Sequence, residues 1–252
     1  MSKQHYANIA DLYDSFVTMQ TDVPFFVNEA QKANGPVLEL MSGTGRLSIP
    51  LLQAGIPLTC VDYSPYMLAR LRERLDQNNL TAAVYEMDVR TFELGQQYQQ
   101  IIIPFGAFSE LPSHADQQQA LERIHAHLAD GGTFICALGN PPVRIKSVDH
   151  ELHLAGRFPT EQGQLFVWLL QQHDPNTKLV NVMEFFELYD AQGVMTSKRF
   201  SEIQFHLLEK AVFERLIGEA GFEVVDLYGD YSYAPFEGQT SPFMLWVLRK
   251  AP

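Results

Sequence analysis

The chain has 252 residues, of which 46% are hydrophobic and 19% charged, a composition typical of a globular protein with a sizeable core. Its formal net charge is −12, and such a surface repels phosphate backbones, which disfavours nucleic acid as a partner. No apolar run approaches the roughly 20 residues of a membrane span and no signal pattern opens the chain, so we expect no membrane contact and a cytoplasmic location.

Residues 1–36 have aromatic and apolar positions at near-helical spacing. Ile9, Leu12 and Phe16 mark a first helix, and Pro24 is expected at the start of a second one. The pattern therefore predicts a helical segment in front of the main fold.

A strand, a glycine turn and a helix are predicted from residue 37 onward. Glu39 places an acid where the first apolar run ends, and Gly43 and Gly45 follow it. Glycines allow a sharp turn, and without side chains they let a ligand lie against the backbone. This arrangement is typical of the opening unit of a nucleotide-binding α/β sheet.

The second predicted strand, residues 57–62, ends in Asp62. A carboxylate at the tip of this strand can accept hydrogen bonds from both hydroxyls of a ribose. The glycine turn and Asp62 together fit any adenosine-containing cofactor, and they do not choose between such cofactors.

Three further strands complete a predicted parallel sheet. Residues 82–87 end at Asp88, residues 98–105 contain a continuous β-branched run typical of a strand covered on both faces, and residues 133–138 form the fifth strand. Helices alternate with these strands, one beginning at Ser64. This alternation requires right-handed crossovers between parallel strands.

The pattern changes after Gly139. Three strands of an antiparallel insertion are predicted, at residues 165–172, 179–189 and 194–206. A helix over residues 207–220 then returns to the core. It is followed by strands at residues 222–227 and 242–248, and the loop between these two is too short for a helical crossover, so the pair should be antiparallel.

Residues 39–46, 61–64 and 87–89 resemble the motifs of class I S-adenosylmethionine-dependent methyltransferases, most closely the branch that acts on small molecules. The resemblance covers roughly residues 6–250. A reversed strand at the end of a parallel sheet also separates this family from dehydrogenases. One residue departs from the family pattern, because Met41 stands where the family usually has glycine, which predicts a wider first turn of the loop.

The resemblance implies an α/β fold with a Rossmann-like, seven-stranded, mostly parallel sheet whose last strand is antiparallel. It implies one methyltransferase domain over residues 1–252, divided into an N-terminal helical cap (1–36), a cofactor-binding core (37–140), an antiparallel β lid insertion (141–206) and a C-terminal helix with a β-hairpin (207–252). The cofactor would be S-adenosylmethionine, and the product would be S-adenosylhomocysteine.

The resemblance also implies cofactor-binding residues. Asp88 would accept from the adenine amino group, and the backbone amide of Val89 would meet the adenine ring. The complete predicted cofactor set is Glu39, Met41, Ser42, Gly43, Gly45, Arg46, Asp62, Tyr63, Met67, Asp88, Val89, Pro104 and Phe105.

The acceptor would lie under the N-terminal cap, the lid and the last loop. We predict that a small-molecule substrate contacts Tyr6, Tyr13, Phe105, Phe108, Tyr231 and Tyr233. The candidate proton acceptors are Tyr13, His114 and His206, and Tyr231 and Tyr233 are further candidate bases. No metal site is predicted, because His125 and His127 point away from each other on a helix and the residues around His150 suit a solvated loop.

The expected reaction transfers a methyl group to an O, N or C nucleophile by in-line displacement. A sulfonium makes its methyl group electrophilic, so the protein needs only to align the nucleophile and remove a proton. One alternative is a cyclase, isomerase or non-catalytic binding protein of the same fold that keeps S-adenosylmethionine unreacted. A remote alternative is an NAD-dependent oxidoreductase, although Ser48 replaces the third glycine of that fingerprint. We expect a monomer or a homodimer.

Overall fold

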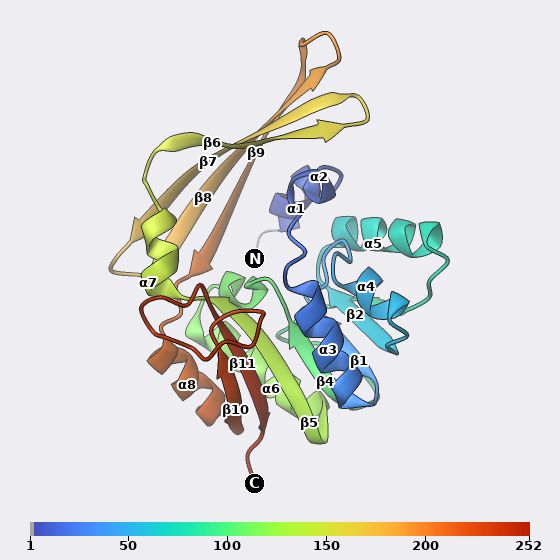
Figure 1. Ribbon diagram of the computed structural model, residues 1–252, viewed down its shortest axis with the longest axis vertical. Helices are drawn as coiled ribbons and strands as arrows, with labels where there is room; N and C mark the ends of the chain where they lie inside the picture. The colour runs from blue at the N-terminus through green and yellow to red at the C-terminus, as the bar shows by residue number, and fades with distance from the viewer. Residues whose placement is uncertain (1–2) are drawn as a thin grey trace.

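The computed structural model describes residues 3–252, and two β-sheets organise that part of the chain (Figure 1). Seven strands form the core sheet, in the spatial order β10 (Phe222–Tyr228), β11 (Phe243–Lys250), β5 (Leu128–Gly139), β4 (Tyr98–Ile103), β1 (Val37–Leu40), β2 (Leu58–Asp62) and β3 (Ala83–Glu86). Four strands form a second sheet, the lid, in the order β6 (Leu152–Thr160), β7 (Gly163–Asp174), β8 (Leu179–Asp190) and β9 (Met195–His206).

The core sheet confirms the predicted fold. Strands β1 to β5 pair in parallel, whereas β11 is antiparallel to both of its neighbours, β5 and β10. The last strand is therefore the reversed one, and it is inserted between β5 and β10 rather than added at the edge. The loop between β10 and β11 is too short to carry a helix across the sheet, so the chain turns back beside its own preceding strand.

Helices cover both faces of the core sheet. On one face, buried apolar side chains of three helices pack on the strands; these helices are α3 (Val23–Ala33), α4 (Ser48–Gln53) and α5 (Pro65–Gln77). On the other face the covering helices are α6 (His114–His127) and α8 (Lys210–Glu219). The predicted start of α5 is confirmed, since the Ser64 hydroxyl accepts a hydrogen bond from the amide of Met67 and Pro65 follows at the first helical position.

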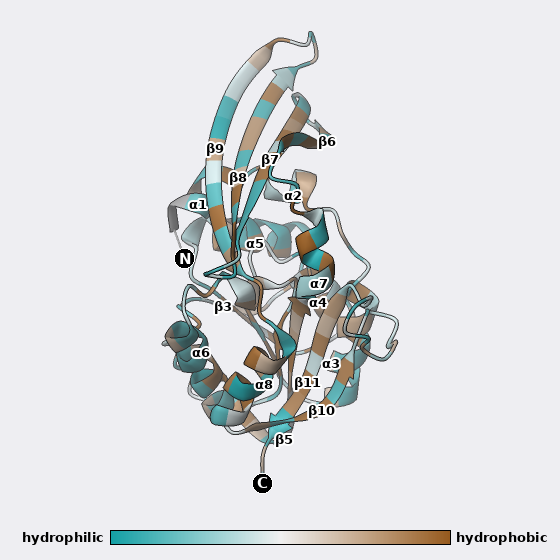
Figure 2. Ribbon diagram, turned by 90° about the vertical axis from the view of Figure 1, so that its left-hand side faces the viewer, coloured by the Kyte–Doolittle hydropathy of each residue, from teal (hydrophilic) through white to brown (hydrophobic). Residues whose placement is uncertain are grey.

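The lid has four strands, one more than the sequence predicted. The additional strand, β6, pairs with β7 at the edge of the lid, and its side chains are exposed or half-buried throughout. A register shift between Leu154 and Gly156 interrupts the alternation of side chains along β6, so its period-2 pattern is weak, and Figure 2 shows mixed hydropathy colours in the lid. Pairing with β7 holds β6 in the sheet, and Phe158 packs against the apolar cluster that the cap and the lid share.

Short helical segments connect the lid to the core. The N-terminal helices α1 (Lys3–Ile9) and α2 (Tyr13–Phe16) lie between the two sheets (Figure 1), and Ile9 and Leu12 pack against Phe186 of the lid. The remaining turns are η1 (Ala107–Glu110), which follows β4, and α7 (Pro141–Arg144) and η2 (Ile145–Ser147), which lead from β5 into the lid. The ends of β1, β2 and β4 thus face a space that the cap and the lid enclose.

Within residues 3–252, no helix is long and apolar enough to cross a membrane.

Gly45 should be important for stability because its φ angle is +81° and a Cβ there would lie 2.3 Å from Cδ1 of the buried Leu71. Gly45→Ala is expected to lower the free energy of unfolding by about 2 to 4 kcal/mol, from backbone strain and overpacking together. Gly55 is a matched control, since its φ is +80° but a Cβ would meet nothing within 4 Å. Gly55→Ala should cost only about 1 to 2 kcal/mol. Equal losses in urea titrations would contradict the role of Leu71.

Candidate active site

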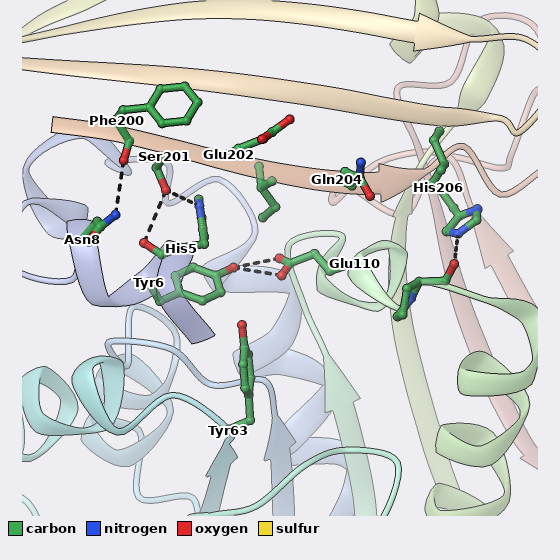
Figure 3. A pocket seen from close by; sticks show the side chains of 13 residues that line it. His5, Tyr6, Asn8, Tyr63, Glu110, Phe200, Ser201, Glu202, Gln204 and His206 are labelled. Atoms are coloured by element: carbon green, nitrogen blue, oxygen red, sulfur yellow. Dashed lines mark hydrogen bonds between the residues drawn. The ribbon is translucent and has the colours of Figure 1, made fainter. Parts of the chain in front are cut away.

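Three neighbouring cavities with shared lining residues lie where the carboxyl ends of the core strands face the cap and the lid. The first, the cofactor pocket, has a volume of about 60 Å³ and lies against the glycine loop, which spans residues 41–46. The second, the acceptor chamber, has a volume of about 400 Å³ beneath the lid. The third, the side cavity, has a volume of about 420 Å³ and is shown in Figure 3. Tyr6 and Glu110 line all three.

Asp62 joins the tip of β2 to the glycine loop. One of its carboxylate oxygens accepts a hydrogen bond from the amide of Gly43 and the other accepts one from the amide of Ser64, both at 2.8 Å. Burial raises the pKa of Asp62 to about 6, although these amides oppose the shift. The carboxylate therefore sits at a wall of the cofactor pocket with lone pairs to spare.

The glycine loop leaves room for a ligand beside Gly43. Its φ angle is +56°, and a Cβ built there would meet only the methyl carbon of Met67, at 4.0 Å. Met41 has a φ of +59°, which is the left-handed conformation that glycine adopts without steric cost, and its side chain packs against the core. The residue that departs from the family pattern thus keeps a backbone conformation that a glycine would favour.

Glu39 supplies a second carboxylate at the tip of the neighbouring strand β1. It is 1% exposed, and the hydroxyl of Ser48 donates a hydrogen bond to it at 2.5 Å. Burial raises the pKa of Glu39 to about 7, and the negative charge of Asp62 contributes in the same direction. Ser48 stands where a dinucleotide-binding fingerprint would have its third glycine, and its hydroxyl is bonded to Glu39.

Arg46 ties the N-terminal segment to the glycine loop. Its guanidinium donates two hydrogen bonds to the fully buried carboxylate of Asp22 and one to the carbonyl of Met19, and it lies 4.7 Å from the centre of the Phe105 ring. The hydroxyl of Thr44 also donates to Asp14, at 2.6 Å. The cap is therefore held at the mouth of the cofactor pocket.

Glu110 was not among the residues predicted from the sequence. It lies in η1, where both of its oxygens accept hydrogen bonds from the hydroxyl of Tyr6, at 2.9 and 3.0 Å (Figure 3). Loss of hydration, with the nearby charges of Asp62 and Glu184, raises the pKa of Glu110 to about 7. In the sequence, the only sign of a role for Glu110 is its position shortly after Pro104 and Phe105. The turn η1, which directs its side chain into the cavities, is seen only in the structure.

The acceptor chamber has an aromatic wall and a second buried carboxylate. Tyr13, Phe16, Phe105 and Tyr231 line it. Glu184, on β8, also lines it, and its Oε2 is buried without a hydrogen bond to any described residue. Burial raises the pKa of Glu184 to about 7. The chamber thus combines apolar surface with incompletely satisfied negative groups.

Most of the predicted cofactor residues line the cofactor pocket. Gly45, Asp88 and Val89 line none of the three cavities. The carboxylate of Asp88 is instead bonded to Arg90, and Val89 is 3% exposed in the core. Those that line the pocket are Glu39, Met41, Ser42, Gly43, Arg46, Asp62, Tyr63, Met67, Pro104 and Phe105.

The predicted substrate residues divide into two groups. Tyr6, Tyr13 and Phe105 line the cofactor pocket and the acceptor chamber, and Tyr231 lines the chamber. Phe108 and Tyr233 do not reach the chamber. Phe108 is fully buried against the ring of Phe213, and Tyr233 donates a hydrogen bond to Glu29 beside α3. In the last loop, Tyr231 therefore faces the chamber, whereas Tyr233 faces α3.

The predicted proton acceptors differ in their access to the chamber. Tyr13 lines it, but burial and the charge of Glu110 hold the pKa of Tyr13 far above its usual range, so the phenol stays protonated. His206 also lines it, with Nε2 donating to the carbonyl of Pro112 at 2.8 Å. His114 is exposed and lies 6.4 Å from His206, ring centre to ring centre.

The residues present fit an adenosyl sulfonium cofactor. Asp62 offers a carboxylate at the place where a ribose would lie, Gly43 offers space and backbone, and the pocket wall is acidic. Tyr6, Tyr13 and Phe105 line both this pocket and the acceptor chamber, so they form the boundary between the two. A carboxylate-tipped parallel sheet with a reversed last strand is the architecture that the resemblance to class I methyltransferases predicts.

Comparison with known proteins agrees with this class. The family model described as a methyltransferase domain matches residues 37–132. A glycine/sarcosine/dimethylglycine N-methyltransferase of Actinopolyspora halophila is 25% identical over 226 residues, 88% of this chain and 37% of the relative. A glycine/sarcosine N-methyltransferase of Halorhodospira halochloris is 23% identical over 251 residues, 95% of this chain and 85% of the relative. The chain thus spans little more than a third of one relative and most of the other.

A solved structure resembles the whole chain. The CcbJ methyltransferase of Streptomyces caelestis superposes with a TM-score of 0.84, at 23% sequence identity, and the match covers 100% of each chain. These findings agree with the sequence prediction of a class I S-adenosylmethionine-dependent methyltransferase: residues 37–132 match the methyltransferase domain, and the whole chain has the fold of a solved methyltransferase. S-adenosylmethionine is its cofactor, and the nicotinamide alternative is set aside.

Asp62→Ala is expected to weaken S-adenosylmethionine binding by about 10- to 100-fold, because the ribose hydroxyls lose a charged acceptor. Isothermal titration calorimetry measures this directly. Asp130→Ala, which removes a carboxylate with a side chain 99% exposed, is the control and should bind as the wild type does. Circular dichroism should verify folding, since the amides of Gly43 and Ser64 also lose a partner. An unchanged dissociation constant in folded Asp62→Ala would refute the assignment.

Proposed function

We propose that this chain methylates an amine nitrogen of a small molecule that occupies the acceptor chamber. The observation that carries this proposal is the meeting of Glu110 and Glu184 in one aromatic-walled chamber next to the cofactor pocket. Two buried carboxylates attract a cation, and a protonated amine is the cationic form of a nitrogen nucleophile. That both curated relatives are N-methyltransferases supports the choice of nitrogen.

The cofactor supplies an electrophilic methyl group on a sulfonium. The chain's own residues would hold and orient the two reactants: Asp62 and the Gly43 backbone at the adenosyl part, and Phe105 and Tyr13 between the cofactor pocket and the chamber. Alignment of two held reactants can lower a barrier by roughly 7 to 11 kcal/mol at best. Aromatic walls also exclude water from the reacting atoms.

We infer that Glu110 accepts the proton that the amine must lose. The bound cofactor would supply an electrophilic methyl carbon, to which the nitrogen would bond with its lone pair while the carbon–sulfur electron pair passed to sulfur. A protonated amine has no free lone pair, so it must lose a proton before this step. Glu110 borders both the cofactor pocket and the chamber, and a pKa of about 7 suits proton transfer near neutral pH.

Several narrower expectations accompany this proposal. The net charge of −12 supports an acceptor other than nucleic acid. Residues 1–252 are proposed to form one methyltransferase domain, divided as the sequence predicts. The chain is proposed to act in the cytoplasm as a monomer or a homodimer, and Asp88 is proposed to contact adenine after release from Arg90.

The proposal is tested by incubating the protein with S-adenosylmethionine and a panel of small amines, alcohols and thiols. Mass spectrometry should detect S-adenosylhomocysteine together with an amine heavier by one methyl group. If only alcohols or thiols gain the methyl group, the choice of nitrogen is wrong. If cofactor binds but no panel member or metabolite extract yields S-adenosylhomocysteine, the cyclase, isomerase or binding-protein alternative is favoured.

Glu110→Gln is expected to lower kcat by about 100-fold or more while leaving S-adenosylmethionine affinity within a few-fold of the wild type. In the wild type, kcat should rise as the pH passes through about 7, because the carboxylate form increases there, and the variant should lose this step. Glu202→Gln is the control: Glu202 is exposed and lines the side cavity but not the chamber. An unchanged pH profile in Glu110→Gln would exclude the proton-accepting role.

A further inference from the structure

The acceptor chamber also contains a cation without a charged partner. Arg144, the last residue of α7, lines the chamber. Its hydrogen bonds to described residues go to neutral acceptors, the hydroxyl of Ser147 and the side-chain oxygen of Gln171, the latter at 2.9 Å. Burial lowers its pKa, and no neighbouring carboxylate opposes that shift. A half-buried guanidinium in this state can still accept an anion from a ligand.

Arg144 is also held in place, which reduces the entropy that a ligand would have to remove. Its guanidinium lies 5.1 Å from the centre of the Phe205 ring on β9, and Gln171, its partner on β7, is 6% exposed. The amide nitrogen of Gln171 donates to no described residue, so it offers a second donor beside the guanidinium. Planar, preorganised donors of this kind suit the two oxygens of a carboxylate.

The register of the lid places Gln171, the hydrogen-bond partner of Arg144, on the same face as Glu184. Gln171 pairs with Val182 across β7 and β8, and Glu184 lies two residues farther along β8 on the same face. Oε2 of Glu184 has no hydrogen-bond partner among the described residues, so neither Gln171 nor Arg144 satisfies it. An α-amino acid carries both a carboxylate and an amine, so it can offer a charge of each sign to Arg144 and to Glu184, which both line the acceptor chamber.

We propose that the acceptor is an amino acid, whose carboxylate binds Arg144 and Gln171 while its amine lies toward Glu184 and Glu110. This inference rests on the proposed methylation of an amine and adds the second recognition group. Arg144 lines the chamber but not the cofactor pocket, so its anion is that of the acceptor and not the methionine carboxylate of the cofactor. Arg144 thereby selects acids over the corresponding simple amines.

Turnover provides the first test. The standard amino acids and their decarboxylated amines are compared as acceptors by release of S-adenosylhomocysteine, and amino acids should be preferred. Arg144→Met should lower kcat/KM for the preferred amino acid by on the order of 10- to 100-fold and leave the amines unchanged. Arg144→Lys, which keeps the charge but loses the planar fork, should recover part of this loss. Cofactor affinity, measured by calorimetry, should not change.

The matched control is Arg157→Met. Arg157 lies on β6 with its guanidinium 5.0 Å from the centre of the Phe166 ring, much as Arg144 lies against Phe205, but it is exposed and does not line the chamber. It should leave the preference between acids and amines as in the wild type. Simple amines reacting as well as amino acids, or weaker cofactor binding in Arg144→Met, would overturn the inference.

A binding measurement separates this inference from the proposed function. Sodium acetate should raise the Tm of the protein saturated with S-adenosylhomocysteine, relative to sodium chloride of equal ionic strength, and Arg144→Met should abolish the rise. If no acceptor turns over, the proposed function fails, while acetate protection still decides the role of Arg144. Equal acetate protection in the wild type and in folded Arg144→Met would rule out an anion site there.

Discussion

The site depends on carboxylates that burial has deprived of water. Loss of hydration raises the pKa of each above its usual range, and the charge of Glu110 is further disfavoured by Asp62 and Glu184. A cation placed among them offsets both the desolvation and the mutual repulsion. A sulfonium and an ammonium ion are such cations, so the electrostatics of the site match the reactants of an amine methylation. The four carboxylates are Glu39, Asp62, Glu110 and Glu184.

These charges are gathered from distant parts of the chain. Glu39 and Asp62 end neighbouring parallel strands and therefore meet at one edge of the sheet, whereas Glu110 comes from the turn after β4 and Glu184 from the lid. The N-terminal cap is bonded to both the glycine loop and the turn after β4. Arg46 of the loop donates a hydrogen bond to Asp22, and Tyr6 of the cap donates one to Glu110. The cap and the lid also share an apolar cluster, so the cofactor pocket and the chamber close around the same side chains.

The sequence was sufficient to predict the core fold and the cofactor half of the site. Alternation of strands and helices, the glycine loop and the acids at strand ends are local patterns, and parallel strands bring such ends together by geometry alone. Glu39, Gly43 and Asp62 could therefore be named before the structure, and they line the cofactor pocket. The reversed last strand followed from loop length. The edge strand β6 was not predicted, because a register shift between Leu154 and Gly156 interrupts its alternating pattern.

Only the tertiary structure shows which side chains line the acceptor chamber. Whether an aromatic or charged side chain of a cap, lid or loop faces a cavity depends on turns and on strand register, which leave no periodic signal in the sequence. Phe108 and Tyr233 were expected at the chamber but lie in the core and beside α3. Glu110, Glu184 and Arg144 face it, because a short turn, a paired lid strand and the end of α7 direct them there. The sequence was thus sufficient to predict the cofactor. The packing of the cap and the lid determined which charged side chains line the acceptor chamber.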